Sequence, residues 1–311
     1  MKKTLLATAI ISGLVSATAQ AATVYDKDGT TMKIGGRVEV RGDFLSADGD
    51  ELEGTMFDMS RARIKFNGKT KITENLTGFG FMEYQIEPGD EVKNRYLFAG
   101  LGTKIGDFSY GRQDTANVQI SDMTDIASVH SGIQQYIGEA SDKENNTFLY
   151  SGTLADTLTI QVNYIANGEE DDADPTTTVD DSYGISGLWA SDFGLDLGAS
   201  YTSGEEDNQA TLGAAYTLND LYVGVTYAMG EDGTDNDFTS LEAAVQYKFT
   251  KEFRLIGMLG MAEDDVEDTE EFYALEAQYR FNKSIRTFVS YALNNLDDGE
   301  DSLVAGVRYN F

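Results

Sequence analysis

Charged residues occupy every second position in two early segments, namely Arg37, Glu39 and Arg41 in the first and Arg61, Arg63 and Lys65 in the second. Small or apolar residues, among them Val38, Val40 and Ile64, fill the positions between them. Successive side chains of an extended strand point to opposite faces, so each segment has one charged face and one apolar face. Fixed charges on a wet surface select the ions and solutes that pass it. We therefore expect these charged faces to line a water-filled space.

Other kinds of site chemistry have few residues to support them. The 311-residue chain has no cysteine and one histidine, which excludes disulfides, thiol nucleophiles and multi-histidine metal sites. His130 could serve as a general base, but no Gly-x-Ser-x-Gly nucleophile elbow accompanies it, and an ordinary loop histidine is the simpler interpretation. We expect no catalytic residue, no metal site and no cofactor, and do not expect an enzyme.

The charge balance of the chain is strongly acidic, with 53 Asp and Glu against 23 Lys and Arg and a formal net charge of -30. Nucleic acid is an unfavourable partner, because binding to phosphate backbones relies on Lys and Arg that displace counterions. The runs Asp48–Glu51 and Asp232–Asp237 lack the spacing of an EF-hand loop. They indicate solvated loops, or diffuse binding of divalent cations, rather than a defined calcium site.

The first 21 residues follow the three-part order of a secretion signal. Lys2 and Lys3 precede the apolar stretch Leu5–Val15, and Ala19-Gln20-Ala21 places small residues at both recognition positions for cleavage. The alternative is an N-terminal helix of the folded domain. We expect residues 1–21 to be a cleaved signal peptide and residues 22–311 to form one folded domain.

From Thr31 to Phe311, segments of about ten residues alternate apolar and polar positions, as in the terminal set Leu303, Ala305, Val307, Tyr309 and Phe311. We expect about sixteen such strands, on the spacing typical of membrane barrels. Short turns are expected at Lys104–Gly106, Asn219–Asp220, Thr250–Glu252 and Asn282–Ser284. Long, mostly acidic loops are expected at Ser46–Thr55, Ala166–Asp180, Gly230–Asp237 and Ala262–Glu270. Short turns alternating with long loops predict an all-β, antiparallel, up-and-down transmembrane barrel.

The apolar faces of these segments carry no charge, which suits contact with lipid. Tyrosines such as Tyr201, Tyr247 and Tyr309 lie near strand ends, as in the aromatic girdles of membrane barrels, although tyrosines can also fill the core of a soluble sandwich. Open strand edges cannot face lipid, so the sheet must close. A barrel of about sixteen strands is too wide for side chains to fill, which predicts an aqueous channel.

One connection, Gln113–Asp142, is long and mixed in character, with Ile120, Met123, Ile126 and Ile133 among its apolar residues. We expect it to fold inward, pack on the barrel wall and narrow the pore. Its acidic residues Asp122, Asp125 and Glu139 would then face the lumen. The alternative is an external loop that contacts another subunit.

Several motifs resemble the Gram-negative general porins, most of all the OmpU-type porins of vibrios and their relatives. They are Tyr25–Thr30, Ser60–Gly68, Leu76–Gly80, Asn94–Gly102, Gly106–Arg112, Thr124-Asp125, Ser128–Gly132 and the terminal Tyr309-Asn310-Phe311. The resemblance covers the whole chain after the signal. It implies a homotrimer of sixteen-stranded barrels, each with its third extracellular loop folded inside, that passes small hydrophilic solutes by diffusion.

The resemblance also implies a constriction with basic residues on the wall and acidic residues on the inserted loop. By motif position the basic set is Arg37, Arg63, Arg112 and Lys143, and Asp125 matches one loop acid. Val129 stands where the second acid of the enterobacterial pattern would be. Glu39, Arg41 and Arg61 are further lumen charges. Phe98 and Phe108 are candidates for contact between subunits.

The function expected from these features is an outer-membrane porin of a Gram-negative bacterium, surrounded by lipid and lipopolysaccharide. Acidic residues around one mouth should concentrate cations, and this preference should weaken as salt screens them. Two alternatives stay open. One is a solute-specific channel, which would show saturable block. The other is a plugged barrel that acts as an adhesin or an outer-membrane enzyme.

Overall fold

The computed structural model describes residues 21–47, 49–89, 92–168, 181–234, 236–296 and 299–311. The predicted signal peptide therefore lies outside the described residues, apart from Ala21 at its end. Within these ranges, no helix has both the length and the apolar character that crossing a bilayer demands.

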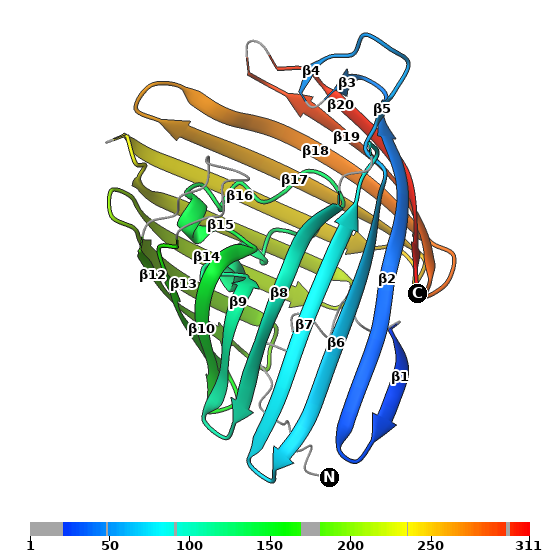
Figure 1. Cartoon of the computed structure of the whole chain (residues 1–311). Coiled ribbons are helices and arrows are strands. Elements are labelled where there is room, and N and C mark those ends of the chain that lie inside the picture. The colour runs from blue at the N-terminus through cyan, green and yellow to red at the C-terminus, as the bar shows by residue number, and fades with distance from the viewer. Residues whose placement is uncertain (1–20, 48, 90–91, 169–180, 235, 297–298) are drawn as a thin grey trace.

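Within the described residues, sixteen long strands close into one antiparallel barrel (Figure 1). They are β2 (Thr30–Asp43), β6 (Arg61–Thr73), β7 (Leu76–Ile86), β8 (Val92–Thr103), β9 (Gly106–Gln113), β10 (Glu144–Leu154), β11 (Leu158–Ile165), β12 (Ser182–Ala190), β13 (Leu195–Ser203), β14 (Asn208–Leu218), β15 (Leu221–Glu231), β16 (Asp237–Lys248), β17 (Phe253–Asp264), β18 (Asp268–Arg280), β19 (Ile285–Asn294) and β20 (Ser302–Asn310). Each strand pairs with the next along this series, and β20 pairs with β2 to close the ring. The predicted fold class is confirmed.

Four shorter strands lie beside this ring: β1 (Ala22–Lys27), β3 (Ser46–Ala47), β4 (Asp50–Glu51) and β5 (Phe57–Asp58). β1 pairs with the first half of β2, while β20 pairs with its second half. The two ends meet at Gly36, whose N–H donates to the carbonyl oxygen of Phe311 (2.9 Å) and whose own carbonyl accepts the N–H of Phe311 (3.1 Å). In the described part of the chain, this pairing closes the ring between β2 and β20.

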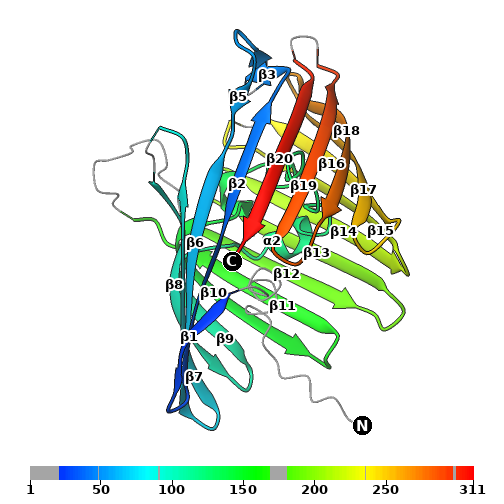
Figure 2. The ribbon, with the colours of Figure 1, turned by 90° about the vertical axis from the view of Figure 1, so that its right-hand side faces the viewer.

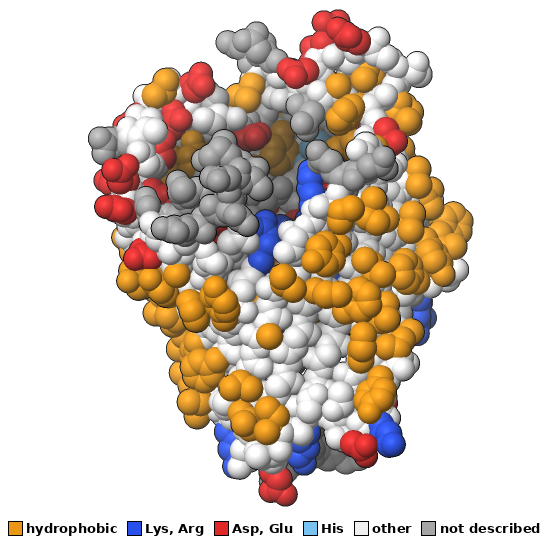
Figure 3. All heavy atoms as spheres, viewed as in Figure 1, with side chains coloured by type: hydrophobic (Ala, Val, Ile, Leu, Met, Phe, Trp, Pro, Cys, Tyr) orange, Lys and Arg blue, Asp and Glu red, His pale blue; other side chains and the backbone are white. Residues whose placement is uncertain are grey.

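The alternation of side chains decides which face of each strand meets lipid. On β2, Val38 and Val40 are 45% and 62% exposed on the outside, while Glu39 between them is fully buried. The same alternation produces a band of hydrophobic side chains on the outer wall (Figure 3). Acidic side chains gather at the end of the barrel that carries the long loops, which we call the loop end (Figure 3). The tyrosines of the expected girdle, such as Tyr201, Tyr247 and Tyr309, are exposed on this outer surface. A sandwich core is therefore the wrong interpretation of these residues.

The four predicted tight turns lie between consecutive strands, but one predicted long loop is wrong. Most of Ala262–Glu270 is strand, because β17 runs to Asp264 and β18 begins at Asp268. The ladder continues through the acidic residues, with Glu263 paired to Asp268 across the hairpin. Acidic composition indicates contact with water, and a strand that projects beyond the membrane meets that condition as well as a loop does.

Candidate functional site

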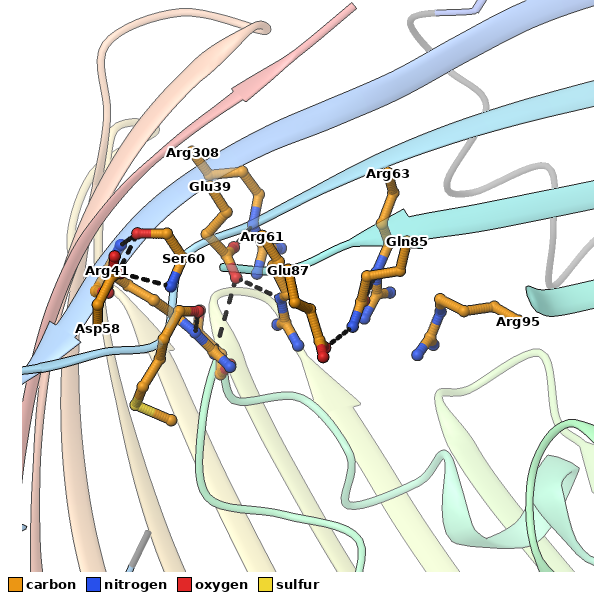
Figure 4. Close-up of polar contacts among 12 residues, drawn as sticks. Glu39, Arg41, Asp58, Ser60, Arg61, Arg63, Gln85, Glu87, Arg95 and Arg308 are labelled. Carbon is orange, nitrogen blue, oxygen red and sulfur yellow. Dashed lines mark hydrogen bonds and ion pairs between the residues drawn. The ribbon is translucent and has the colours of Figure 1, made fainter. Parts of the chain in front are cut away.

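One wall of the barrel interior is built around the carboxylate of Glu39 on β2. Register places Glu39 opposite Arg61 on β6 and opposite Arg308 on β20. Arg61 Nε donates to Glu39 Oε1 (2.8 Å), Arg308 Nε donates to Oε2, and Arg41 Nη1 lies 3.6 Å from Oε1 (Figure 4). A carboxylate that is fully buried but surrounded by three guanidinium groups keeps its charge.

A second group of arginines continues along the same wall on β6 and β8. Arg63 Nε donates to Gln85 Oε1 (2.5 Å), and Arg95 Nε donates to Glu83 Oε1 (2.9 Å). Arg37 lies opposite Arg63 in the ladder, and its Nε is buried with no hydrogen-bond partner. Arginines thus outnumber carboxylates on this wall, which leaves it positive.

Lys143, immediately before β10, belongs to the same positive region. Burial and, to a smaller extent, the charges of Arg95, Arg63 and Arg112 together lower the pKa of Lys143 to about 8. The ammonium group forms an ion pair with Asp142. Arg112 Nη1 donates to Asn145 Oδ1 (2.9 Å). The four residues of the predicted basic set therefore lie along one electrostatically connected stretch of the wall.

The segment between β9 and β10 contains α2 (Val118–Ser121) and the 3-10 turn η1 (Gly138–Ala140). α2 lies against β12, β13 and β14 (Figure 2). Glycines make room for it: a Cβ added at Gly213 would lie 2.6 Å from Met123 Sδ, and one at Gly224 would lie 2.3 Å from the Met123 carbonyl oxygen. We call the wall that carries Arg37, Arg41, Arg61, Arg63, Arg95 and Arg308 the arginine wall. The part of the segment around α2 rests on the strands that lie across the ring from it.

Polar side chains of the barrel hold the middle of this segment through its backbone. Glu276 Oε2 accepts the N–H of Ser128 (2.9 Å), and Glu242 Oε2 accepts the N–H of Gly132 (2.8 Å). Gln209 Nε2 donates to the Gln134 carbonyl (2.6 Å). From the arginine wall, Arg41 Nη1 donates to the Ser128 carbonyl (3.2 Å).

Apolar contacts complete the attachment of the segment to the barrel. Ile126, Ala127 and Ile133 pack on a cluster of buried wall residues that includes Ile256, Met258 and Phe272. Ile137 and Tyr136 pack near Phe238, whose ring stacks on that of Tyr136 at a centroid distance of 4.0 Å. The segment is therefore fixed by both packing and hydrogen bonds.

Two of the three predicted loop acids lie together. Enclosure within the barrel and, to a smaller extent, the nearby charges of Asp114 and Asp125 together raise the pKa of Asp122 to about 7. Lys143 opposes this effect, which places the positive end of the wall within electrostatic reach of Asp122. The carboxylate of Asp125 accepts a hydrogen bond from Ser131 Oγ (2.5 Å). Both side chains are exposed to the water inside the barrel.

Glu139 lies apart from Asp122 and Asp125. Its charged neighbours are Asp207, in the connection between β13 and β14, and Glu144. Burial, a hydrogen bond with Asp207 and the charge of Asp207 raise the pKa of Glu139 to about 7. The three loop acids thus form two separate groups rather than one.

Comparison with known proteins gives this geometry its context. The family model described as Gram-negative porin matches residues 7–299. The chain belongs to this porin family. Outer membrane protein U of Vibrio parahaemolyticus is 32% identical over 346 aligned positions, and Porin-like protein L of Photobacterium profundum is 30% identical over 352; both alignments cover all of both chains. The solved structure of Salmonella typhi OmpF in complex with daunomycin has the same fold, with a TM-score of 0.80, 22% identity, and coverage of 93% of this chain and 100% of that chain.

The porin is therefore an outer-membrane protein of the Gram-negative type, and its barrel is a channel for small hydrophilic solutes. Among the described residues, no group of three or more His, Asp or Glu side chains is placed to hold a metal ion. His130 lies in the long segment, with its ring 6.0 Å from that of Phe272, and burial lowers its pKa.

Alternation in the sequence places Glu242, Glu276 and Arg308 on the faces opposite the apolar ones, but sequence reasoning gave them no role at the site, and it missed Glu83 and Arg95 of the porin lumen altogether. Glu83 sits at a regular inward position of β7, so period-two alternation applied to that strand was the signal available for it. Arg95 is different, because the ladder between β7 and β8 pairs Glu83 with Tyr96 and Tyr84 with Asn94 and leaves Arg95 unpaired. An irregularity of this kind interrupts the alternation that a sequence displays.

Proposed function

We propose that this porin conducts small hydrophilic solutes with a preference for cations, through a constriction between the arginine wall and the segment 114–142. The observation that carries the proposal is the position of Asp122 and Asp125 on a segment fixed to one side of the barrel, with Lys143 and the arginines on the other side. Opposed fixed charges order the water between them. An apolar solute has to displace that water, whereas an ion or a sugar does not lose its polar contacts.

Cation preference follows from the charges at the loop end. Acidic side chains such as Glu51, Glu205 and Glu263 are exposed there and raise the local concentration of cations. The preference weakens at high ionic strength, because exposed charges are screened over about 10 Å at 0.1 M salt. We further propose that the porin is a channel without enzymatic activity.

We propose a homotrimer in the outer membrane, in contact with lipid and lipopolysaccharide. One structural neighbour is the trimer form of OmpT, an outer membrane protein of Vibrio cholerae, and that chain has a TM-score of 0.72 and 16% identity. Of the two aromatic residues considered for the subunit contact, Phe98 is only 6% exposed and packs on Phe81, so it is not available. Phe108 is 46% exposed and remains a candidate. Removal of residues 1–21 on export is part of the proposal, and N-terminal sequencing of the mature porin tests it.

The experiment is a recording of single-channel current and reversal potential in planar bilayers under a KCl gradient. The native porin should close in three steps and give a cation-selective reversal potential. Asp125→Asn and Asp122→Asn should each reduce that selectivity, while Asp220→Asn, in the short turn between β14 and β15, should leave it unchanged. Folded protein without conductance contradicts the proposal and favours a plugged barrel. Saturable block by one solute favours a solute-specific channel instead.

A further inference from the structure

A second basic cluster lies at the turn end of the barrel, away from the arginine wall around Glu39. It lines a cavity of about 70 Å³ between the ends of β16, β17, β18 and β19. Its basic members are Lys248, Lys251, Arg254, Arg280 and Arg286. The cavity has room for several water molecules, since about 10–15 Å³ of such volume holds one.

The basic side chains on the strands point toward the lumen rather than toward lipid. The residues two positions further into the barrel on the same faces are Gln246, Ile256, Gln278 and Phe288, and all four are buried. The outward neighbours, such as Tyr247 and Tyr279, are exposed on the outer girdle. Because side chains alternate, Lys248, Arg254, Arg280 and Arg286 share the inner face.

The register sets like charges directly against each other at this end of the sheet. Lys248 is paired with Arg254, and Arg286 is paired with Arg280 on one side and Arg308 on the other. Like charges directly opposite each other on a sheet are destabilising. A bound anion removes this repulsion.

Among the described residues, Glu276 acts electrostatically on Arg254 and Arg286, and Glu39 on Arg286, but neither carboxylate lines the cavity. No ion pair within 4 Å joins Lys248, Lys251, Arg254, Arg280 or Arg286 to a described carboxylate. A neutral oxygen, Gln278 Oε1, accepts from Arg254 Nε (2.8 Å) and from Arg286 Nη1 (3.4 Å). Arg286 Nε is buried with no hydrogen-bond partner. Glu252 also lines the cavity, and its Oε2 accepts from Thr250 Oγ1 (3.0 Å).

We propose that this cavity binds a water-borne phosphate group, as inorganic phosphate or a small phosphate monoester, at the periplasmic mouth of the porin. Guanidinium groups donate two parallel hydrogen bonds to phosphate oxygens, and lysine adds a compact positive charge. Short turns mark the periplasmic end of a membrane barrel. The ligand comes from the aqueous lumen, because the cationic groups are on the inner face and lipid contacts the outer one.

The test is isothermal titration of the detergent-solubilised porin with inorganic phosphate, against chloride at the same ionic strength. The native protein should bind phosphate. The double variant Lys248→Gln/Arg280→Gln should bind it at least about tenfold more weakly, because it loses two charged contacts. The matched control is Lys71→Gln/Lys104→Gln, which removes the same charge from exposed lysines elsewhere at this end and should bind phosphate as the native protein does. Thermal unfolding at the native temperature, followed by intrinsic fluorescence, shows that both variants are folded.

Planar-bilayer recordings give a second, directional measurement. Phosphate added on the turn side should reduce the current of the native channel and not that of Lys248→Gln/Arg280→Gln. Equal loss of phosphate binding in the control double variant overturns the proposal. Phosphate would then be attracted by the overall positive charge at this end of the barrel and not by the cavity. Competition by vesicles that contain phosphatidylglycerol, but not by phosphatidylcholine vesicles, also overturns it, since a lipid headgroup is then the ligand.

Discussion

Glu242 of β16 holds the backbone of the long segment at Gly132, whose N–H lies 2.8 Å from Glu242 Oε2. The adjoining N–H of Ile133 also points to this oxygen, at 3.4 Å. A buried wall carboxylate thus supplies the acceptors that the irregular backbone lacks. This contact fixes the segment to the barrel wall at β16.

Glu242→Ala should loosen the segment without unfolding the barrel. Hydrogen bonds to a charged group contribute about 1.5–3 kcal/mol each, and the substitution leaves the N–H groups of Gly132 and Ile133 without these bonds. We expect noisier single-channel current and faster proteolytic cleavage between residues 126 and 137. Glu267→Ala, at an exposed carboxylate in the turn between β17 and β18, is the control. If the current of Glu242→Ala were as quiet as that of the native channel, Glu242 would not be needed to hold the segment in place.

Gly224→Ala should displace the segment by overpacking. The new Cβ would lie 2.3 Å from the Met123 carbonyl oxygen, a backbone atom that cannot rotate away. Overpacking of this kind costs about 1–3 kcal/mol. We expect altered conductance and a lower temperature of thermal unfolding, followed by intrinsic fluorescence. Gly257→Ala on β17 should change neither quantity, because its Cβ meets no atom within 4 Å. Equal effects of the two substitutions would contradict the contact with Met123.

Cation selectivity should depend on pH near neutrality. The pKa of Asp122 is raised to about 7, so the carboxylate loses its charge as pH falls through this value, and selectivity should fall with it. Reversal potentials measured from pH 5 to pH 9 should show this inflection in the native porin and not in Asp122→Asn. Glu139→Gln is the matched control, because the pKa of Glu139 is also about 7 but its partner is Asp207. If Glu139→Gln lost the inflection instead, the pH dependence of selectivity would come from Glu139 and Asp207 and not from Asp122.

The same raised pKa has a consequence for stability. The folded porin binds the Asp122 proton more tightly than the unfolded chain does, whose Asp has a pKa of about 4. The stability of the native porin should therefore fall as pH rises between about 4 and about 7, and Asp122→Asn should show a smaller fall. Thermal unfolding across this range checks the sign. A native stability that rises through the interval, with no difference from Asp122→Asn, would be inconsistent with the raised pKa.

Glu39→Gln should weaken the arginine wall. Breaking a fully buried ion pair costs about 3–5 kcal/mol, and the loss here should be smaller, because lumen water solvates the freed guanidinium groups of Arg61 and Arg308. We expect reduced thermal stability and lower cation selectivity, since the wall loses a negative charge. Glu51→Gln, at an exposed acid of the loop end, removes the same charge without breaking an ion pair and should leave stability unchanged. A variant as stable as the native porin would show that Glu39 is not needed to hold the wall together.

The alternation of Val38, Glu39 and Val40 determined, by itself, which side of β2 faces lipid, because side-chain direction in a strand depends only on position along the chain. The number of strands, the closed barrel and the inward charges of β2 and β6 follow from the same local rule. Motif resemblance added Arg112 and Lys143, which alternation alone does not single out.

The tertiary structure decided the contacts between distant parts of the ring. Glu242 and Glu276 are ordinary inward carboxylates in the sequence, and only the path of the segment 126–137 makes them acceptors for its backbone. The same path separates Glu139 from Asp122, and strand pairing, not acidity, decides that most of Ala262–Glu270 is a hairpin. Local periodicity fixes the direction of a side chain, but the partner it meets depends on chain closure over a hundred residues or more, as between Glu242 and Gly132 at a separation of 110 residues.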